Sequence, residues 1–226
     1  FNEMGWDALN ALSAEDREAV LQAIFGKDGA CFDYCRLPMG ANDFAMSFYS
    51  SADVAGDFNL VNFNIDRDRY ILIPYIKAAR QINPDLRIWA SPWCPPPWMK
   101  TNNHYASAVR PSGEKDVNGL LPREAIAEFS TGFRMEEGYL KTYADYFARF
   151  IKAYEAEGLP LECIHVQNEP CSNQVFPSCK WRTEDLTFFL GHYLGPTFER
   201  ENIKTDIYFG TVSYTHLRAH ETLAIS

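Results

Sequence analysis

The sequence predicts an α/β protein in which parallel strands alternate with helices. Five short apolar runs suited to strands alternate with segments of helical periodicity along the 226 residues. The turns from helix to strand are short, the loops from strand to helix are long, and no glycine-rich phosphate-binding turn follows the first strand. Long loops after strands are typical of a (β/α)8 TIM barrel, which builds its active site from them. Because such a barrel needs eight strands, we expect one that is truncated to about its first five βα units.

Each expected strand is a short apolar run that a proline, a glycine or a polar turn ends. The first of them has room only for the end of a strand. In the fourth, Pro170 has no amide hydrogen for a sheet ladder, so Asn168 and Glu169 should lie at the C-terminal tip of the strand. The expected strands occupy Phe1–Gly5, Cys31–Met39, Leu86–Pro92, the stretch Cys163–Pro170, and Thr205–Thr211.

The expected helices carry apolar residues at steps of three and four. Ser13 and Asp16 form a capping box at the start of the first helix, and Gly26 ends it. The third helix has an aromatic stripe from Tyr139 to Tyr154, which we interpret as core packing. The expected helices cover 13–26, about 67–81, 139 to about 158, and 183 to about 200. Three long loops, 40–66, 103–136 and 171–182, are of the kind that carries function.

The composition excludes several classes of partner. The chain is 46% hydrophobic and 15% aromatic, which suits a globular protein with a sizeable core. Its 30 acidic and 21 basic side chains give a net charge of −9, which argues against nucleic acid or an anionic membrane surface as the main partner. No apolar run approaches the roughly 18 residues of a membrane span. A neutral, hydroxyl-rich ligand suits an acidic surface rich in aromatic residues, whereas the oligomeric state is not predicted.

The two ends of the chain lead to further expectations. The sequence opens at Phe1 with neither an initiator methionine nor a signal segment, so we expect a processed or cut start. The last residues, 213–226, are too short for another βα unit and resemble a spurious tail of conceptual translation, so we expect a non-native tail. His216 and His220 lie there in the order H-x-x-x-H-E, whereas a zinc protease helix needs H-E-x-x-H. We therefore expect no zinc site.

The six cysteines form no metal-binding pattern. Cys31 and Cys35 lie in one predicted strand, where four residues of about 3.3 Å each separate them too far for a disulfide. Cys171 and Cys179, eight residues apart in one loop, are the only pair that we suspect of a bridge.

The candidate site residues share one position, at or just beyond the tips of predicted strands. Aromatic faces, an arginine, an asparagine and two carboxyl groups at one barrel mouth are what a sugar-cleaving site requires. The candidates are Arg36, Asp43, Trp93, Trp98, Asn168 and Glu169.

Every candidate except Asp43 also has a purely structural interpretation. Glu169 could cap a neighbouring loop or helix, and Asn168 could stabilise a turn. Arg36 could be an ordinary ion-pair partner, and the two tryptophans could be core aromatics.

Several motifs together resemble glycoside hydrolase family 30, the family of glucosylceramidases and endo-β-1,6-glucanases. The resemblance covers roughly residues 1–212, although the usual glycine-rich lead before Phe1 and everything after the fifth strand are missing. The motifs are R-L-P-M at 36–39, D-F at 43–44, D-F-x-L-x-N-F at 57–63, A-S-P-W-x-x-P-x-W-M-K-T-N at 90–102, Q-N-E-P at 167–170, S-C at 178–179 and L-G-P at 194–196.

The resemblance implies a retaining β-glycosidase whose (β/α)8 catalytic domain is partly present in residues 1–212. Glu169 matches the general acid/base of the family, and Asn168 matches the residue that bonds the sugar 2-hydroxyl. Asp43 and Trp93 match binding positions at the sugar subsite next to the scissile bond. Arg36 matches an arginine that helps to position the nucleophile. In the family, the nucleophile is a glutamate at the end of the seventh strand, and no residue of this chain can be assigned that role.

The resemblance also implies the partners. It points to a carbohydrate or glycolipid substrate, to no metal or organic cofactor, and to a secreted or extracytoplasmic location. Two alternatives stay open, a xylan- or fucoside-directed relative and an inactive carbohydrate-binding fragment. Without the nucleophile, the chain as written is expected at most to bind sugar.

Overall fold

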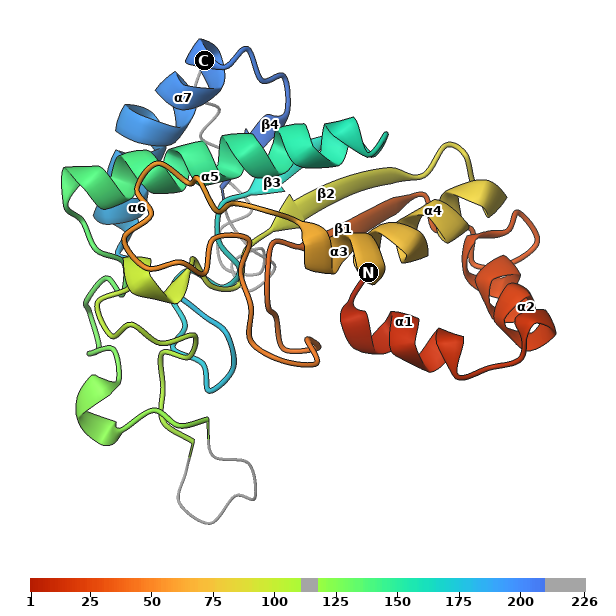
Figure 1. The fold of residues 1–226 in the computed structure, drawn as a ribbon, viewed down its shortest axis with the longest axis horizontal. Helices are drawn as coiled ribbons and strands as arrows, with labels where there is room; N and C mark the ends of the chain where they lie inside the picture. The colour runs from red at the N-terminus through yellow and green to blue at the C-terminus, as the bar shows by residue number, and fades with distance from the viewer. Residues whose placement is uncertain (111–117, 210–226) are drawn as a thin grey trace, which may run out of the picture.

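The computed structural model describes residues 1–110 and 118–209. Within these ranges four parallel strands form one sheet in the order β1-β2-β3-β4 (Figure 1). The strands are β1 (Tyr34–Pro38), β2 (Arg87–Ser91), β3 (Cys163–His165) and β4 (Asp206–Tyr208). The predicted α/β class with a parallel sheet is confirmed, and the predicted tail with His216 and His220 lies outside the described residues.

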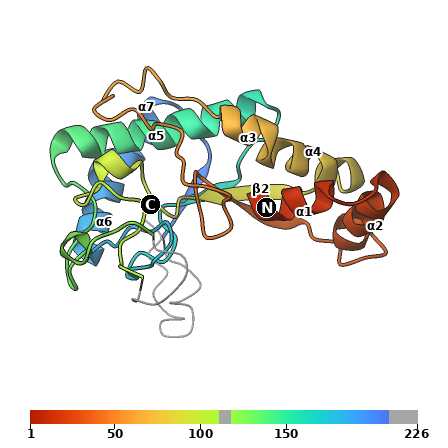
Figure 2. The ribbon, with the colours of Figure 1, turned by 60° about the horizontal axis from the view of Figure 1, so that its bottom comes forward.

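Helices connect each strand to the next. The parallel register pairs Arg36 with Trp89, Ala90 with Ile164, and His165 with Tyr208. Because all four strands are parallel, their carboxyl ends meet along one edge of the sheet, and each pair of strands needs a crossover connection. Figure 2 shows α3, α4 and α5 above the sheet, and Figures 1 and 2 show the long loops gathered beyond its end. The helices are α1 (Glu3–Asn10), α2 (Ala14–Phe25), α3 (Asp66–Tyr70), α4 (Leu72–Ile82), α5 (Glu137–Ala156), α6 (Thr183–Phe189) and α7 (Gly195–Arg200).

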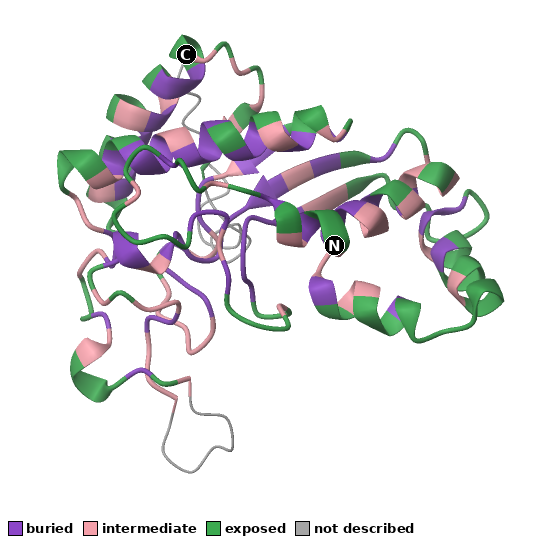
Figure 3. Cartoon of the chain, viewed as in Figure 1, coloured by how far each residue is buried: buried purple, intermediate pink, exposed green. Residues whose placement is uncertain are grey.

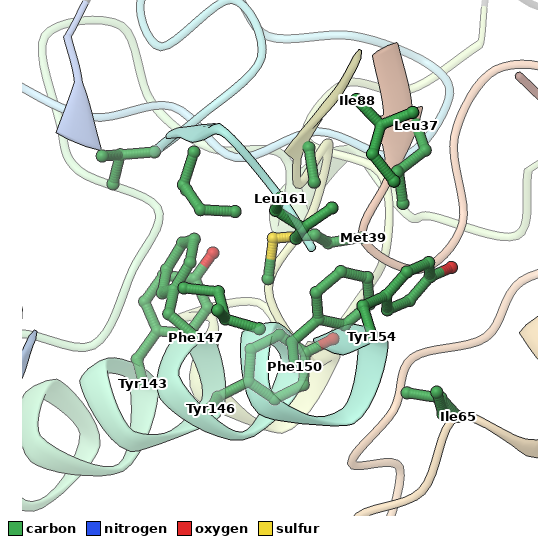
Figure 4. Packing of buried hydrophobic residues seen from close by; sticks show 14 of the residues in the cluster. Leu37, Met39, Ile65, Ile88, Tyr143, Tyr146, Phe147, Phe150, Tyr154 and Leu161 are labelled. Atoms are coloured by element: carbon green, nitrogen blue, oxygen red, sulfur yellow. The ribbon is translucent and has the colours of Figure 1, made fainter. Parts of the chain in front are cut away.

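The aromatic stripe of α5 forms the centre of the hydrophobic core, as its spacing predicts. Tyr143, Phe147 and Phe150 are fully buried and point toward strand residues such as Leu37 and Ile88 (Figure 4). Figure 3 shows the same division along the chain, with buried residues on the strands and on the inward faces of the helices. Burying an aromatic side chain contributes on the order of 2 kcal/mol, so this stripe fixes α5 on the sheet.

The opposite face of the sheet carries a row of aromatic rings. Neighbouring residues of a strand point to opposite faces, so Arg36 points away from the α5 core while Leu37 points into it. Ring centroids are 4.4 Å apart between Trp89 and His165 and 5.6 Å apart between His165 and Tyr208. The Arg36 side chain therefore lies on the sheet face that carries the rings of Trp89, His165 and Tyr208, and it extends from there toward the ends of the strands.

One strand expectation is wrong. Phe1–Gly5 is not the end of a strand, because the Asn2 side chain accepts a hydrogen bond of 2.7 Å from the Gly5 amide and caps a helix that starts at Glu3. Only the amine of Phe1, which donates to the Arg36 carbonyl at 2.6 Å, stays beside β1. The described residues therefore hold four strands instead of five.

Two predicted helices are interrupted near prolines. The expected helix at 67–81 divides at Ile71, because Pro74 has no amide hydrogen to donate to the carbonyl one turn earlier. The expected helix at 183–200 becomes α6, a π-helical turn at Leu190–Leu194, and α7, with Pro196 in the first turn of α7.

The cysteine expectation is wrong as well. All six cysteines are free, and the suspected bridge between Cys171 and Cys179 does not form, because the first thiol is exposed and the second is buried.

Among the described residues, no helix is both long enough and apolar enough to cross a membrane.

A buried carboxyl group ties the loop of residues 40–66 to two helices. Asp68 of α3 is 1% exposed, and it accepts hydrogen bonds from the hydroxyl groups of Tyr49 at 3.0 Å and Tyr154 at 2.7 Å. Burial raises the pKa of Asp68 to about 6, against the opposing effect of these two donors. The folded protein therefore holds a proton on Asp68 at a pH where the unfolded chain has released it.

This linkage predicts a pH-dependent stability. Between about pH 4 and pH 6, the unfolded chain has lost the Asp68 proton and the folded protein has kept it, so the free energy of unfolding falls as the pH rises. We expect Asp68→Asn to remove roughly 2–3 kcal/mol of this fall. Urea unfolding at pH 4.5 and pH 7 measures it.

A matched control comes from the same helix. Asp66 is exposed, so Asp66→Asn should leave the pH dependence of unfolding as in the wild type. An Asp68→Asn protein that loses stability with pH as steeply as the wild type would contradict the assignment of a bound proton to Asp68.

Candidate active site

Arg36 holds the ends of three strands together. Its Nε donates to Ser91 Oγ at 2.9 Å, its Nη2 donates to the same hydroxyl, and Nη2 also donates to Asn168 Oδ1 at 2.9 Å. Ser91 is the last residue of β2, and Asn168 follows β3 by three residues. The parallel register places these ends at one edge of the sheet, so one side chain from β1 reaches both.

Two tryptophan rings lie under the Arg36 guanidinium. The guanidinium carbon is 4.0 Å from the ring centroid of Trp93 and 4.9 Å from that of Trp89. Such contacts contribute roughly 0.5–2 kcal/mol each and fix the plane of the guanidinium group. Trp93 is held in turn, since Gln167 Nε2 donates to its carbonyl at 2.7 Å.

Glu169 stands beside this cluster on an unusual backbone. The Asn168 amide donates to the Pro92 carbonyl at 2.8 Å, which extends the pairing of the second and third strand beyond the regular ladder. Glu169 then has φ of 45°, in the left-handed region that residues other than glycine rarely adopt. Gln174 Nε2 donates to Glu169 Oε2 at 2.9 Å. Backbone strain of this kind clusters at functional sites.

The charges of three side chains act on one another. Burial lowers the pKa of Arg36 to about 10, although Asp43 and Glu169 act against that shift. Partial burial raises the pKa of Asp43, its own backbone and Arg36 oppose the rise, and Glu169 adds to it. Arg36 is therefore still a cation at neutral pH and faces two carboxyl groups.

A buried glutamate holds the loop that carries Asp43. Glu3 is 1% exposed, and its Oε2 accepts a hydrogen bond of 2.8 Å from the amide of Met46. Arg67 donates to both oxygens of Glu3, at 2.6 and 2.7 Å. The Met4 amide also donates to the Phe44 carbonyl at 3.2 Å, so α1 fixes the chain on the C-terminal side of Asp43.

The structure brings five of the six candidates together and directs the sixth elsewhere. Arg36, Trp93 and Asn168 are in contact, and Asp43 and Glu169 act on Arg36 electrostatically. Trp98 is 8% exposed and belongs to the core, where its indole nitrogen donates to the Ala52 carbonyl at 2.8 Å. Its ring packs against Phe58 and Tyr139.

Sequence reasoning did not single out three residues of this cluster. Ser91 and Trp89 lie in or beside the tryptophan motif, and their alternation with Ala90 was a usable signal for their shared face. Gln174 has no such signal, because its contact with Glu169 depends on the path of an irregular loop.

Two cavities lie in the long loops, and neither is lined by Arg36 or Glu169. The smaller, of about 400 Å³, is lined by Thr101, Asn102, Asn103, Arg123, Glu124, Ala125, Ile126, Ala127 and Ser130. The larger, of about 580 Å³, is lined by Phe48, Tyr49, Ser50, Asp53, Val54, Asn62, Asn64 and Arg67. Across residues 1–110 and 118–209, no group of His, Cys, Asp and Glu is arranged to hold a metal ion.

Comparisons with known proteins agree on one family. A family model described as the glycosyl hydrolase family 30 TIM-barrel domain matches residues 2–119, more than half of the chain. A Caenorhabditis elegans protein that bears a glucosylceramidase name is 34% identical over 74% of this chain and 28% of its own length. The lysosomal acid glucosylceramidase of Mus musculus is 29% identical over 84% of this chain and 34% of its own length. A solved endo-β1,6-glucanase superposes with a TM-score of 0.73 and 26% identity, over 92% of this chain and 42% of that one.

The fold and the matches define a glycoside hydrolase domain of the parallel α/β type. The chain belongs to glycosyl hydrolase family 30, as the sequence resemblance predicted. It spans between 28% and 39% of the length of the curated relatives it matches.

The electrostatic coupling gives a prediction for Asp43. Because Arg36 lowers the pKa of Asp43, we expect Arg36→Gln to raise that pKa further and Arg36→Lys to raise it less. A pH titration of the Asp43 carboxyl carbon by NMR measures the change.

Arg87 supplies the control, because it lies at the other end of β2 and pairs with Glu162. Arg87→Gln should leave the Asp43 titration in place. If the pKa of Asp43 in Arg36→Gln equals that in the wild type, the two groups are not coupled.

Proposed function

We propose that this chain carries the acid/base half of the active site of a retaining β-glycosidase that acts on β-glucosides. The observation that supports this most is the placement of Glu169 beside Asn168, with Asn168 fixed by Arg36 over the Trp93 ring. The relatives' names, glucosylceramidase and endo-1,6-β-D-glucanase, favour a glucosylceramide-like lipid or a β-1,6-glucan as substrate.

In the first step, a carboxylate attacks the anomeric carbon and the bond to the leaving oxygen breaks. Glu169 gives its proton to that oxygen, so the leaving group departs as a neutral alcohol. Retaining enzymes hold the two carboxyl groups about 5–5.5 Å apart. We propose that the nucleophile is the seventh-strand glutamate implied by the family resemblance, and that Arg36 helps to orient it.

In the second step, water attacks the anomeric carbon of the glycosyl-enzyme. Glu169, now a carboxylate, takes a proton from this water while the ester bond to the nucleophile breaks. The sugar is released with its original configuration, and Glu169 is protonated again.

The neighbouring residues bind the sugar in this proposal. Asn168 hydrogen-bonds the 2-hydroxyl, where contacts strengthen as the transition state forms. Asp43 accepts from a further hydroxyl, and Trp93, which is 9% exposed and lies against the Arg36 guanidinium, supports that group at the sugar subsite next to the scissile bond. Trp98, which lies in the core, acts only by supporting the loop after β2.

The test replaces Glu169 by glutamine in the natural protein that contains this chain. Glutamine keeps the shape but cannot deliver a proton, so cleavage of a β-glucoside with a poor leaving group should slow by roughly 10²–10⁴-fold. An aryl glucoside with an activated phenol needs little protonation, so formation of its glycosyl-enzyme should be largely spared. Added azide, which attacks without a base, should restore turnover and yield the β-glucosyl azide.

Glu162→Gln is the matched control. Glu162 is exposed immediately before β3, at the opposite end of that strand, and the change should leave both substrates unaffected. If Glu169→Gln slows activated and unactivated substrates alike and azide rescues neither, Glu169 is a structural residue. Sugar binding without any hydrolysis by the wild type would favour a binding function instead.

A further inference from the structure

The side chain of Gln174 contacts the carboxyl group of Glu169 directly. Both residues are half-buried in the loop after β3, and the hydrogen bond from Gln174 Nε2 to Glu169 Oε2 measures 2.9 Å. The Ser172 amide donates to the Glu169 carbonyl at 3.0 Å and closes a turn between the two residues. The amide of Gln174 thus meets a carboxyl group that already stands on a left-handed backbone.

The backbone of Gln174 is held from a second loop. Its carbonyl accepts hydrogen bonds from the amides of Ser107 at 3.0 Å and Ala108 at 2.9 Å. The Ser178 hydroxyl lies 3.3 Å from both the nitrogen and the oxygen of Gln174. The backbone of Gln174 is therefore held both by a nearby residue and by two residues that lie far from it in the sequence.

A buried cation anchors the two segments that hold Gln174. Lys100 is fully buried, and its ammonium group donates to the Ser107 hydroxyl at 3.3 Å and to the Ser178 carbonyl at 2.6 Å. It also donates to the carbonyls of Tyr105 and Ala106, both at 3.1 Å. Burying a charge is costly unless its hydrogen bonds are satisfied, so these four acceptors are held firmly in place.

We propose that Gln174 is a positioning residue for Glu169, with Lys100 as the buried anchor that fixes its location. This inference rests on the proposed function of Glu169. The Gln174 amide nitrogen donates to the Glu169 carboxyl group, so it fixes the orientation in which that group serves as the acid of the first step and as the base of the second. The charged groups that face Glu169 are Arg36 from β1 and Asp43 from the loop after it.

The experiment replaces Gln174 by leucine and by glutamate in the natural protein. Loss of one hydrogen bond to a charged group should lower kcat/KM for an unactivated β-glucoside roughly tenfold in Gln174→Leu. An activated aryl glucoside, whose glycosyl-enzyme forms with little protonation, should keep most of its kcat/KM, because only proton transfer depends on the orientation of Glu169. Gln174→Glu, which keeps the shape but has no amide hydrogen to donate, should show the same dependence on the leaving group.

A matched control pair lies on α2. Gln22 Nε2 donates to Glu18 Oε1 at 3.0 Å, which is the same type of contact far from the site, and Gln22→Leu should change the rate with neither substrate. In a Glu169→Gln protein, Gln174→Leu should have no further effect on the unactivated substrate. If the leucine variant does not fold, the glutamate variant decides.

The two proposals can fail separately. If Glu169→Gln shows the substrate dependence and azide rescue described above, but both Gln174 variants keep the wild-type rates, only the role of Gln174 is overturned. An equal loss for activated and unactivated substrates would likewise show that Gln174 is merely structural. If the Glu169 test itself fails, the proposed function is overturned, and the role of Gln174, which rests on it, is overturned as well.

Discussion

The site depends on the guanidinium group of Arg36, on β1, being satisfied at once by groups at the ends of two further strands, β2 and β3. A partly buried cation without partners is unstable, and here Ser91 and Asn168 accept its hydrogen bonds while Trp93 and Trp89 lie under its face. These partners meet only in one register of the parallel sheet. Slippage of β2 by a single residue would move Ser91 to the other face. The constraint that selects the register therefore also assembles the site.

The helices contribute through the loops that they hold. The aromatic stripe of α5 fixes one face of the sheet, and Asp68 and Glu3 then tie the loop of residues 40–66 to α3, α5 and α1. Both carboxyl groups are buried, and charged groups are rarely buried without a specific partner. Their partners include the amide of Met46, three residues beyond Asp43. The contacts that stabilise the loop of residues 40–66 against these helices therefore also fix the position of Asp43.

Much of the site could be predicted because its signals are local. Pro38 and Pro92 mark where β1 and β2 stop, whereas β3 ends at His165, five residues before the Pro170 that was expected to end it. Parallel strands still bring their carboxyl ends to one edge, so Arg36, Trp93 and Glu169 could be placed together. The first residues of the chain could form either a helix or the end of a strand. The hydrogen bond from the Gly5 amide to the Asn2 side chain favours the helix, and the sequence alone does not reveal that bond. The side-chain direction of Trp98 depends on the 3₁₀ turn Pro97–Met99, which the motif does not reveal.

The stereochemistry of the reaction tests the central claim most directly, because a site built around Arg36 and Glu169 is proposed to act with retention. The first sugar released from a β-glucoside by the natural protein can be followed by ¹H NMR before mutarotation. The β-anomer should appear first and the α-anomer only later, as expected when two carboxyl groups act through a glycosyl-enzyme. An α-anomer as the first product would mean direct attack by water and would contradict the assigned roles.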